Sequence, residues 1–412
     1  QAFAECQRLT KAYSDFRTQQ MYPANYFLSK VHPGTCEFSE SNQRTGRFLV
    51  KTLESDDSGA SWEWKGWTHA YFSLPAAVLP GSPEPLDPGK NNECGDCTVT
   101  GPILTGNPVN FLTGGKLETA VDYRAASGGL EWSRYYASQQ PIQPRGAAIG
   151  PRWRTWLDRR VDVYDVSGVT TALVSRPSGD LYLYTRNSSG IWVGDTDVKY
   201  SLAPFMSGST QIGWEVGTPG DSIERFDLDG KLSSVSELNG DELTITYVSG
   251  KASAVTDRHG RSIALTYTAD KLSSLTLPDG SKIRYGFDAS DRLETVQYLI
   301  GTSGGTPQFD SIRYKYEDSA RPFALTGKVD ETNGAYVTWT YNSSGQVQST
   351  VKGNPSGNIE KIQFSYGASG VTVTYPLGEI VTHTAVRQAG RAKLAATNKL
   401  CPGCGGQSFQ SR

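Results

Sequence analysis

The sequence has few methionines, few histidines and almost no net charge. Of its 412 residues, 40 are Lys or Arg and 42 are Asp or Glu, which gives a formal charge of -2. Charges of one sign do not gather in runs, so the sequence offers no phosphate-binding surface and disfavours nucleic acid as a partner. Its longest weakly apolar run, YFSLPAAVLP at 71–80, contains Ser and Pro and is far shorter than a bilayer span. The sequence therefore predicts a chain that does not span a membrane.

Several motifs of common catalytic sites are also missing. The sequence contains no P-loop, no Gly-x-Gly-x-x-Gly and no His-Glu-x-x-His. The four histidines are scattered, and His259 stands in a turn where a structural role is expected. Two close carboxylate pairs lie in Gly-bearing turns, where Asp caps backbone amides more often than it performs acid–base chemistry or binds Ca²⁺: Asp195 with Asp197, and Asp227 with Asp229. We therefore expect no catalytic residue, no cofactor and no enzymatic activity, with the N-terminal region as the one place where an enzyme stays an alternative.

Six cysteines occur in three pairs, and their state is open from sequence. The pairs are Cys6 with Cys36, Cys94 with Cys97, and Cys401 with Cys404. Paired cysteines suit disulfides in an oxidising compartment, with Cys6 and Cys36 as one candidate bridge. The two Cys-x-x-Cys pairs also have the spacing to bind one tetrahedral zinc ion, and reduced thiols are the third alternative. The triplet Ala2-Phe3-Ala4 resembles a signal-peptidase site, so we expect a secreted, periplasmic or cell-surface protein whose export signal is not in this sequence.

Turn and strand residues are abundant. Gly (44) and Pro (21) together with Tyr (21) favour a β-dominated fold. Residues 1–80 form a first region, in which Cys6, Leu9, Tyr13 and Phe16 predict a short amphipathic helix. Strands follow at 46–55 and 61–72, and Gly66 is expected to shift the register of the second. Its aromatic residues build a small core or bind sugar rings: Trp62, Trp64, Trp67 and Tyr71.

A short motif recurs in the second half of the chain. Gly240, Gly260 and Gly280 stand twenty residues apart, and an aromatic residue follows each after seven positions: Tyr247, Tyr267 and Phe287. Gly334 and Tyr341 keep the same interval. Apolar residues alternate with polar ones before each aromatic, as in a strand with one buried face. We interpret this set of residues as structural repeats rather than as a site.

The repeats predict antiparallel hairpins. Asn-Gly and Asp-Gly favour two-residue type I′ turns, and such a turn at Asn239-Gly240 would place Leu232 opposite Tyr247. The same register would place Ala252 opposite Tyr267 and Leu272 opposite Phe287. Units of this length bury one face only against their neighbours, which gives an extended sheet.

These motifs resemble the YD repeats of bacterial RHS proteins. Three upstream segments resemble the part of RHS proteins that leads into the repeats: GNPVNFLTGGKLETAVDYR (106–124), LEWSRYYAS (130–138) and GPRWRTWLDRR (150–160). The resemblance implies a β-ribbon that spirals into a hollow shell, which in relatives encloses a C-terminal toxin domain and often ends in a self-cleaving core. This sequence has few repeats and contains neither of those two C-terminal parts.

The expected organisation has five segments. A small α+β region (1–80) and a Pro-rich linker (81–93) precede a lead-in β-sheet region (94–225), the YD repeats (226–392) and a tail (393–412). We expect an all-β fold of hairpin repeats forming a partial RHS-type shell, with an open C-terminal edge that pairs with another chain or with the rest of a shell.

The expected function is a non-catalytic scaffold in interbacterial or cell-surface interaction. The alternative is an adhesin module that binds glycans or proteins through the aromatic residues of the N-terminal region.

Overall fold

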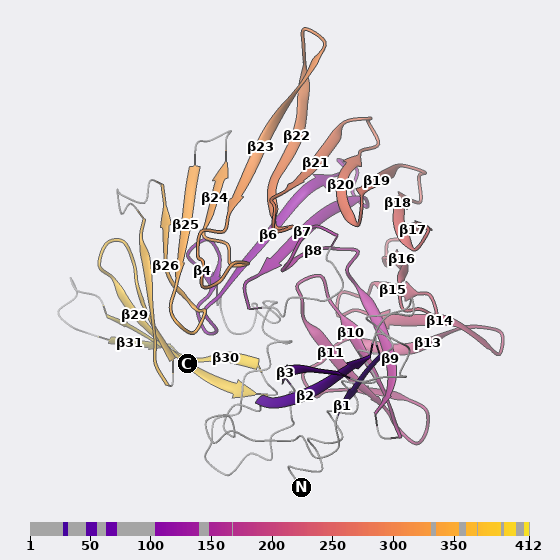
Figure 1. Cartoon of the computed structure of the whole chain (residues 1–412), viewed down its shortest axis with the longest axis horizontal. Coiled ribbons are helices and arrows are strands. Elements are labelled where there is room, and N and C mark those ends of the chain that lie inside the picture. The colour runs from indigo at the N-terminus through magenta and orange to yellow at the C-terminus, as the bar shows by residue number, and fades with distance from the viewer. Residues whose placement is uncertain are drawn as a thin grey trace.

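The computed structural model describes residues 28–31, 47–55, 63–71, 104–139, 148–166, 168–330, 335–353, 360–368, 370–388, 391–400 and 408–411. These residues form strands, turns and irregular segments in four antiparallel sheets, and they contain no helix (Figure 1). The all-β prediction is confirmed. The helix expected over residues 6–16 and the linker at 81–93 lie outside the described residues.

The N-terminal strands form a three-stranded sheet of their own. They are β1 (Leu28–Val31), β2 (Arg47–Ser55) and β3 (Glu63–Tyr71). β2 pairs with β3, and the register shifts between the pairs Lys51 with Trp67 and Leu53 with Trp64. This confirms both predicted strands and the predicted shift beside Gly66.

Two smaller sheets follow in the chain, after this region and before the repeats. The lead-in sheet consists of β4 (Leu104–Thr105), β5 (Val109–Asn110), β6 (Gly115–Arg124), β7 (Glu131–Ala137) and β8 (Trp153–Thr155). The side sheet consists of β9 (Arg160–Val166), β10 (Val169–Ser175), β11 (Leu181–Arg186) and β12 (Trp192–Gly194). In both sheets, strands that are consecutive in the chain are neighbours.

The repeat sheet has 19 strands among the described residues, in chain order from β13 to β31. Its first part is β13 (Ser201–Ser207), β14 (Thr210–Gly217), β15 (Ile223–Phe226), β16 (Leu232–Ser236), β17 (Glu242–Val248), β18 (Lys251–Asp257), β19 (Ser262–Thr268), β20 (Lys271–Thr276), β21 (Lys282–Phe287) and β22 (Leu293–Ser303). Its second part is β23 (Thr306–Lys315), β24 (Gly327–Asp330), β25 (Ala335–Tyr341), β26 (Val347–Lys352), β27 (Ile362–Tyr366), β28 (Gly370–Thr374), β29 (Ile380–Gln388), β30 (Arg391–Leu400) and β31 (Ser408–Ser411).

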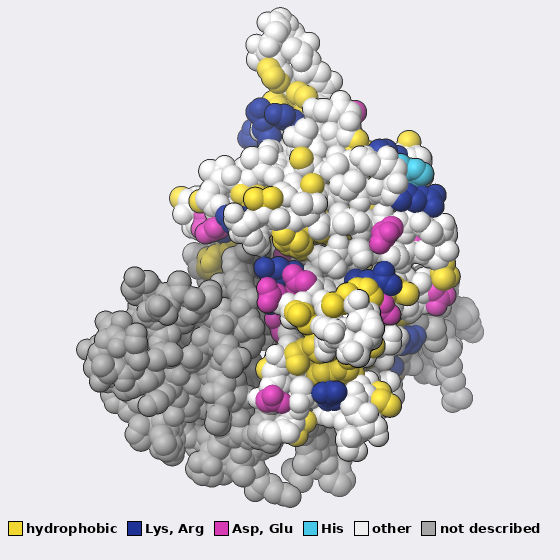
Figure 2. Space-filling model, turned by 90° about the vertical axis from the view of Figure 1, so that its right-hand side faces the viewer, with side chains coloured by type: hydrophobic (Ala, Val, Ile, Leu, Met, Phe, Trp, Pro, Cys, Tyr) yellow, Lys and Arg dark blue, Asp and Glu magenta, His cyan; other side chains and the backbone are white. Residues whose placement is uncertain are grey.

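The repeat sheet curves around the lead-in sheet. In Figure 1 its strands form an arc, and β6, β7 and β8 lie within that arc. The β22–β23 hairpin projects beyond its neighbours in both Figure 1 and Figure 2. Figure 2 also shows hydrophobic side chains gathered on the lower half of one face. Several apolar residues in or beside the side sheet and β13–β14 are exposed: Val163, Val169, Leu183, Ile191, Val193, Met206 and Ile212.

The expected alternation of buried and exposed positions is present in the repeats. In β19, Ile263 and Leu265 are buried whereas Ala264 and Thr266 are exposed. Each hairpin therefore contributes apolar side chains to one shared core, which continues from the lead-in sheet through the repeat sheet. A single repeat could not bury this face alone.

The predicted type I′ turn at Asn239-Gly240 is wrong. Ser236 pairs with Glu242, and the N–H of Glu237 donates to the carbonyl of Asp241 at 2.8 Å. These contacts close a three-residue loop, in which only Gly240 has a positive φ, at 80°. A type I turn followed by one left-handed residue has this form. The two-residue turn occurs instead at the next connection, where Ser249 and Gly250 both have positive φ.

The longer loop shifts the predicted strand register by one residue. The aromatic residues Tyr247, Tyr267 and Phe287 pair with Ala252, Leu272 and Leu293, which follow the next turn, and not with Leu232, Ala252 and Leu272. The expected contact between Tyr247 and Leu232 nevertheless exists, because the tyrosine hydroxyl donates to the Leu232 carbonyl at 2.8 Å. An aromatic side chain therefore contacts two successive hairpins.

Backbone hydrogen bonding joins the side sheet to the repeat sheet. Arg160 and Lys231 form an isolated antiparallel bridge, and the N–H of Val161 donates to the carbonyl of Gly230 at 3.1 Å. A Cβ atom at position 230 would lie 1.7 Å from the carbonyl oxygen of Val161, so this approach requires glycine.

Candidate functional site

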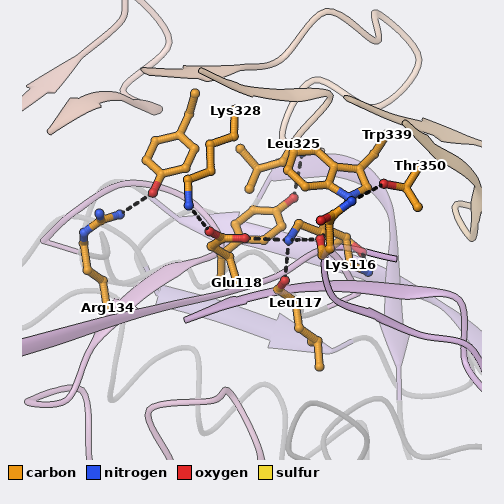
Figure 3. A network of polar contacts seen from close by, with 12 residues as sticks. Lys116, Leu117, Glu118, Arg134, Leu325, Lys328, Trp339 and Thr350 are labelled. Carbon is orange, nitrogen blue, oxygen red and sulfur yellow. Dashed lines mark hydrogen bonds and ion pairs between the residues drawn. The ribbon is translucent and has the colours of Figure 1, made fainter. Parts of the chain in front are cut away.

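Charged side chains on one face of the lead-in sheet point into the repeat sheet. β6 carries Lys116, Glu118 and Asp122, which are an even number of positions apart and therefore share one face of the strand. β7 carries Arg134 and Tyr136. The register sets Glu118 opposite Tyr136, so both strands present these side chains to the same side. We call the resulting network between the two sheets the buried lock, and Figure 3 shows its part around Lys116, Glu118 and Arg134.

Lys116 and Glu118 form the first half of the buried lock. The Lys116 ammonium group lies 2.6 Å from Glu118, donates to the Asn107 carbonyl at 2.7 Å, and sits 4.3 Å from the ring centroid of Trp339. Lys328, from β24, reaches the other oxygen of Glu118 at 2.7 Å (Figure 3). One carboxylate of the lead-in sheet thus receives a cation from each sheet.

The surroundings shift the pKa of both Lys116 and Glu118. Burial lowers the pKa of Lys116 to about 8, although Glu118 opposes this shift. Burial would raise the pKa of Glu118, but Lys116 and Lys328 outweigh it and lower the value to about 2. Near neutral pH the three side chains therefore form a charged cluster in which the two lysines share the carboxylate of Glu118.

Asp122 and Arg134 form the second half of the buried lock. Their side chains are fully buried and lie 2.7 Å apart. The carboxylate of Asp122 also accepts hydrogen bonds from Tyr285 at 2.7 Å and Tyr298 at 2.6 Å. Arg134 donates to the hydroxyl of Tyr314 at 2.8 Å, across 180 residues of sequence. Three tyrosines of the repeat sheet therefore complete an ion pair of the lead-in sheet.

The tyrosine hydroxyls of the buried lock stay protonated. Burial raises the pKa of Tyr285, Tyr298 and Tyr314, and the charge of Asp122 adds to that effect. A protonated hydroxyl donates a hydrogen bond to Asp122, which a phenolate could not do. Near neutral pH these three hydroxyls therefore remain hydrogen-bond donors.

Further polar contacts extend the buried lock along the sheet. The hydroxyl of Tyr136 donates to the Phe323 carbonyl and accepts from the Leu325 N–H, each at 2.9 Å. The indole N–H of Trp339 donates to the Asn107 carbonyl at 3.1 Å. Each of these bonds replaces water at a buried polar group, and together they fix how the two sheets are placed.

The aromatic residues of the repeats have a common bonding pattern. The tyrosine hydroxyl donates to the carbonyl of the aliphatic residue one hairpin earlier: Tyr247 to Leu232, Tyr316 to Leu293, Tyr341 to Leu325 and Tyr366 to Val347, at 2.7–2.9 Å. The basic residue before that aliphatic position lies over the ring at 4.9–6.0 Å from the centroid: Lys231, Lys251, Lys271 and Arg292 over Tyr247, Tyr267, Phe287 and Tyr316. The basic, aliphatic and aromatic positions of the motif therefore serve packing between hairpins.

Turn carboxylates in this region cap backbone amides. Asp227 accepts from the Lys231 N–H at 2.8 Å, Asp257 from that of Arg261 at 3.0 Å, and Asp288 from that of Arg292 at 3.0 Å. This agrees with the structural interpretation of Asp227. Asp197 pairs with Arg391 at 2.7 Å, and the described residues contain no cluster of potential metal ligands.

The described residues include only some of the predicted site residues. Gly240, Gly260 and Gly280 occupy turns with positive φ, and Tyr247, Tyr267, Phe287 and Tyr341 pack against the core. Trp64, Trp67 and Tyr71 lie in β3, of whose side chains nothing is described. The remaining predicted residues lie outside the described residues: Cys6, Cys36, Cys94, Cys97, Cys401, Cys404, Trp62 and Gly334. Disulfides and zinc stay predictions.

Sequence reasoning did not find the buried lock. Charges at alternate strand positions normally indicate a solvent-exposed face. Lys116, Glu118 and Asp122 alternate with Leu117, Val121 and Tyr123 along the strand, so the pattern gave no signal that the charged face is the one that is buried.

Comparison with known proteins gives two family matches. Residues 106–184 match a domain of unknown function (DUF6531), and residues 216–398 match the Teneurin YD-shell. The first match contains the β6–β7 part of the buried lock and the second contains the tyrosines that complete it. No curated protein matches the chain.

Solved structures give remote matches. A crystal structure of TcdB2-TccC3 matches 71% of this chain at 11% identity with a TM-score of 0.29. The same complex without its hypervariable C-terminal region matches 74% at 11% identity with a TM-score of 0.27. The chain covers 19% and 20% of those chains, about a fifth of their length.

The hairpin repeats, their tyrosine contacts and the match at 216–398 define a YD-repeat shell protein. With the matched lead-in domain before the repeats, the chain belongs to the RHS/YD-repeat family. No helix in the described part of the chain is long and apolar enough to cross a membrane.

Proposed function

We propose that this chain is an exported, non-catalytic scaffold, a section of an RHS-type shell that acts in interbacterial or cell-surface interaction. The buried lock is the observation that carries the proposal. Its charges and hydroxyls bond to one another, across the boundary between the two sheets, rather than to an open cleft. Such a network serves to hold a curved sheet in a fixed shape.

The outer edge of β31 supports a partner for this scaffold. β31 pairs with β30 on one side, and no other described strand pairs with it. An unpaired edge presents backbone donors and acceptors to a further strand. We propose that the next strand comes from the remainder of a YD-repeat shell or from another protein chain.

Hydrogen exchange combined with light scattering tests this proposal. The purified chain is measured at low and high concentration by size-exclusion chromatography with light scattering, and exchange is followed in β29–β31 against β17–β20. We expect association at high concentration together with slower exchange of the last strands. A monodisperse monomer whose last strands are already as protected as β17–β20 would contradict an edge that needs a partner.

A binding module in the N-terminal region is the second candidate. In the register of β3 with β2, Trp64 lies opposite Leu53 and Trp67 opposite Lys51. Clustered aromatic residues suit the binding of sugar rings or of a protein surface. Binding on a glycan array that is lost in Trp64→Ala and Trp67→Ala, and kept in Leu238→Ala, would favour this function over a passive scaffold.

A further inference from the structure

The β22–β23 hairpin extends beyond the strands on either side of it (Figure 1). β21 pairs with β22 only as far as Tyr298, and β24 pairs with β23 only from Ile312 onwards. Residues 299–309 therefore pair only with one another among the described residues. A segment that protrudes in this way can reach a flat surface that the strands beside it do not touch.

Three apolar residues lie at one level of this projecting part. Leu299 pairs with Phe309, and the register shift after Leu299 makes Ile300 an extra residue beside this pair. Ile300 is 68% exposed. Apolar side chains that are exposed together on a protruding segment are typical of an interaction site.

The edges of the hairpin are unsuited to a further strand. Pro307 has no backbone N–H to donate, and the bulge at Ile300 bends β22 and increases its twist. Proteins protect the edges of their sheets with these two features. A partner of the hairpin is therefore expected to contact side chains rather than to pair with backbone.

Basic side chains lie on the outer face of the sheet beside the hairpin. Tyr285 of β21 points inward to the buried lock, so Lys282 and Arg284 lie on the outer face by alternation, and both are exposed. Arg284 lies 4.3 Å from the ring centroid of Phe309. Figure 2 shows basic side chains gathered just below the projecting hairpin. Cations and apolar residues thus adjoin on one side of the molecule.

Acidic residues do not neutralise this face. β21–β23 contain two of them, Glu294 and Asp310. Asp310 pairs with Tyr298, which binds the buried lock, so it lies on the inner face, and Glu294 lies at the end of β22 away from the tip. Asp279, in the turn before β21, bonds to Ser281. The two cations of β21 form no ion pair among the described residues.

We propose that the projecting hairpin attaches this protein to the surface of a lipid bilayer with anionic headgroups. Leu299, Ile300 and Phe309 enter the boundary between headgroups and acyl chains, and Lys282 and Arg284 contact the lipid phosphates. The uncharged tip stays among the headgroups. A soluble polyanion would bind the cations but would leave Ile300 in water, so the apolar residues favour a membrane.

This attachment is independent of the scaffold proposal, because it involves neither the buried lock nor β31. Flotation of the full chain with phosphatidylcholine vesicles, made with or without phosphatidylglycerol, tests it. A Lys or Arg near an anionic surface contributes about fivefold to affinity, so we expect vesicles with phosphatidylglycerol to bind at least about tenfold more tightly.

Exposed substitutions separate the apolar contribution from the charged one. Ile300→Ser is expected to weaken binding at least about fivefold, because it removes the most exposed apolar side chain of the hairpin. Lys282→Gln combined with Arg284→Gln is expected to remove the preference for phosphatidylglycerol. Leu238→Ser, at a residue that is 79% exposed in another turn, and Arg258→Gln are the matched controls and keep full binding.

Equal affinity for the two kinds of vesicle, no binding to either, or full binding by the Ile300→Ser protein would overturn the proposal. Dextran sulfate is the soluble anionic probe. If it binds as tightly as the vesicles do and its binding is unchanged in Ile300→Ser, the face recognises a polyanion and the membrane proposal is wrong.

Discussion

The hydroxyl of Tyr298 lies 2.6 Å from a carboxylate oxygen of Asp122, across the boundary between the repeat sheet and the lead-in sheet. The two residues are 176 positions apart in the chain. Their contact ties the matched lead-in domain to the matched YD shell, and it depends on a carboxylate that is fully buried.

Removing the charge of Asp122 should loosen this boundary. Asp122→Asn leaves the buried guanidinium of Arg134 without its ion-pair partner, and breaking a buried pair costs about 3–5 kcal/mol. We expect a loss of that size in the free energy of unfolding, measured by urea denaturation. Asp270→Asn is the control, because its side chain is 92% exposed. Equal stabilities of the two variants would contradict the role of the buried lock.

The repeat tyrosines that contact the preceding hairpin offer a matched pair of hydroxyl deletions. Tyr341→Phe removes the bond of 2.7 Å to the carbonyl of the buried Leu325, which should cost about 1–3 kcal/mol. Tyr267→Phe is the control, since the Tyr267 hydroxyl makes no hydrogen bond to any described residue and Phe287 occupies the equivalent position one repeat later. Thermal unfolding of both variants measures the difference. A Tyr267→Phe variant as unstable as Tyr341→Phe would show that ring packing, not the hydroxyl, decides.

A methyl group at position 230 should destabilise the junction between the side sheet and the repeat sheet. Gly230→Ala would place Cβ 1.7 Å from the Val161 carbonyl oxygen, whereas Gly280→Ala places it in open space at a similar positive φ. Backbone strain alone costs about 1–2 kcal/mol in both variants. We expect Gly230→Ala to lose at least about 2 kcal/mol more, as measured by urea denaturation. Equal losses would mean that the junction opens without cost.

Acid should weaken the contact between the last strands and the lead-in sheet. His383 stacks on Phe111 at a centroid distance of 4.2 Å, and burial lowers its pKa below the ordinary value of 6.5. The unfolded chain therefore binds a proton more readily, and the stability that neutral His383 contributes is full above pH 6.5 and is lost as pH falls through the lower folded-state pKa. Unfolding free energies measured from pH 7.5 downwards should show this slope.

The matched variants for this slope are His383→Phe and His259→Asn. His383→Phe removes the titrating group while keeping a ring against Phe111, so the slope should flatten. His259→Asn changes an exposed turn residue and should retain it. A slope that survives in His383→Phe would assign the acid sensitivity to other groups.

Intact mass distinguishes the three cysteine states. Native protein measured with and without reductant should gain about six mass units on reduction if three disulfides are present. That result would agree with export. A mass increment for one zinc ion, with free thiols, would instead join Cys94, Cys97, Cys401 and Cys404.

Local pattern predicted the strands, whereas long-range contacts could not be predicted. The interval between Gly240 and Tyr247 identified hairpins because glycine in a turn and an aromatic on a buried face are local requirements. The register failed because Asn239-Gly240 suits two loop lengths, and the choice depends on packing of the whole sheet. The buried lock was missed because the hydrogen-bond partners of Asp122, Tyr285 and Tyr298, lie far away in the chain.

The sequential strand order also bears on how the molecule forms. Among the described residues, each strand of the repeat sheet pairs only with its chain neighbours, so pairing can advance hairpin by hairpin as the nascent polypeptide leaves the ribosome. β6 and β7 emerge before the tyrosines that bind them, and their charged face is then available as a template on which the later hairpins settle. Synthesis from the N-terminus therefore delivers the parts in the order in which assembly needs them.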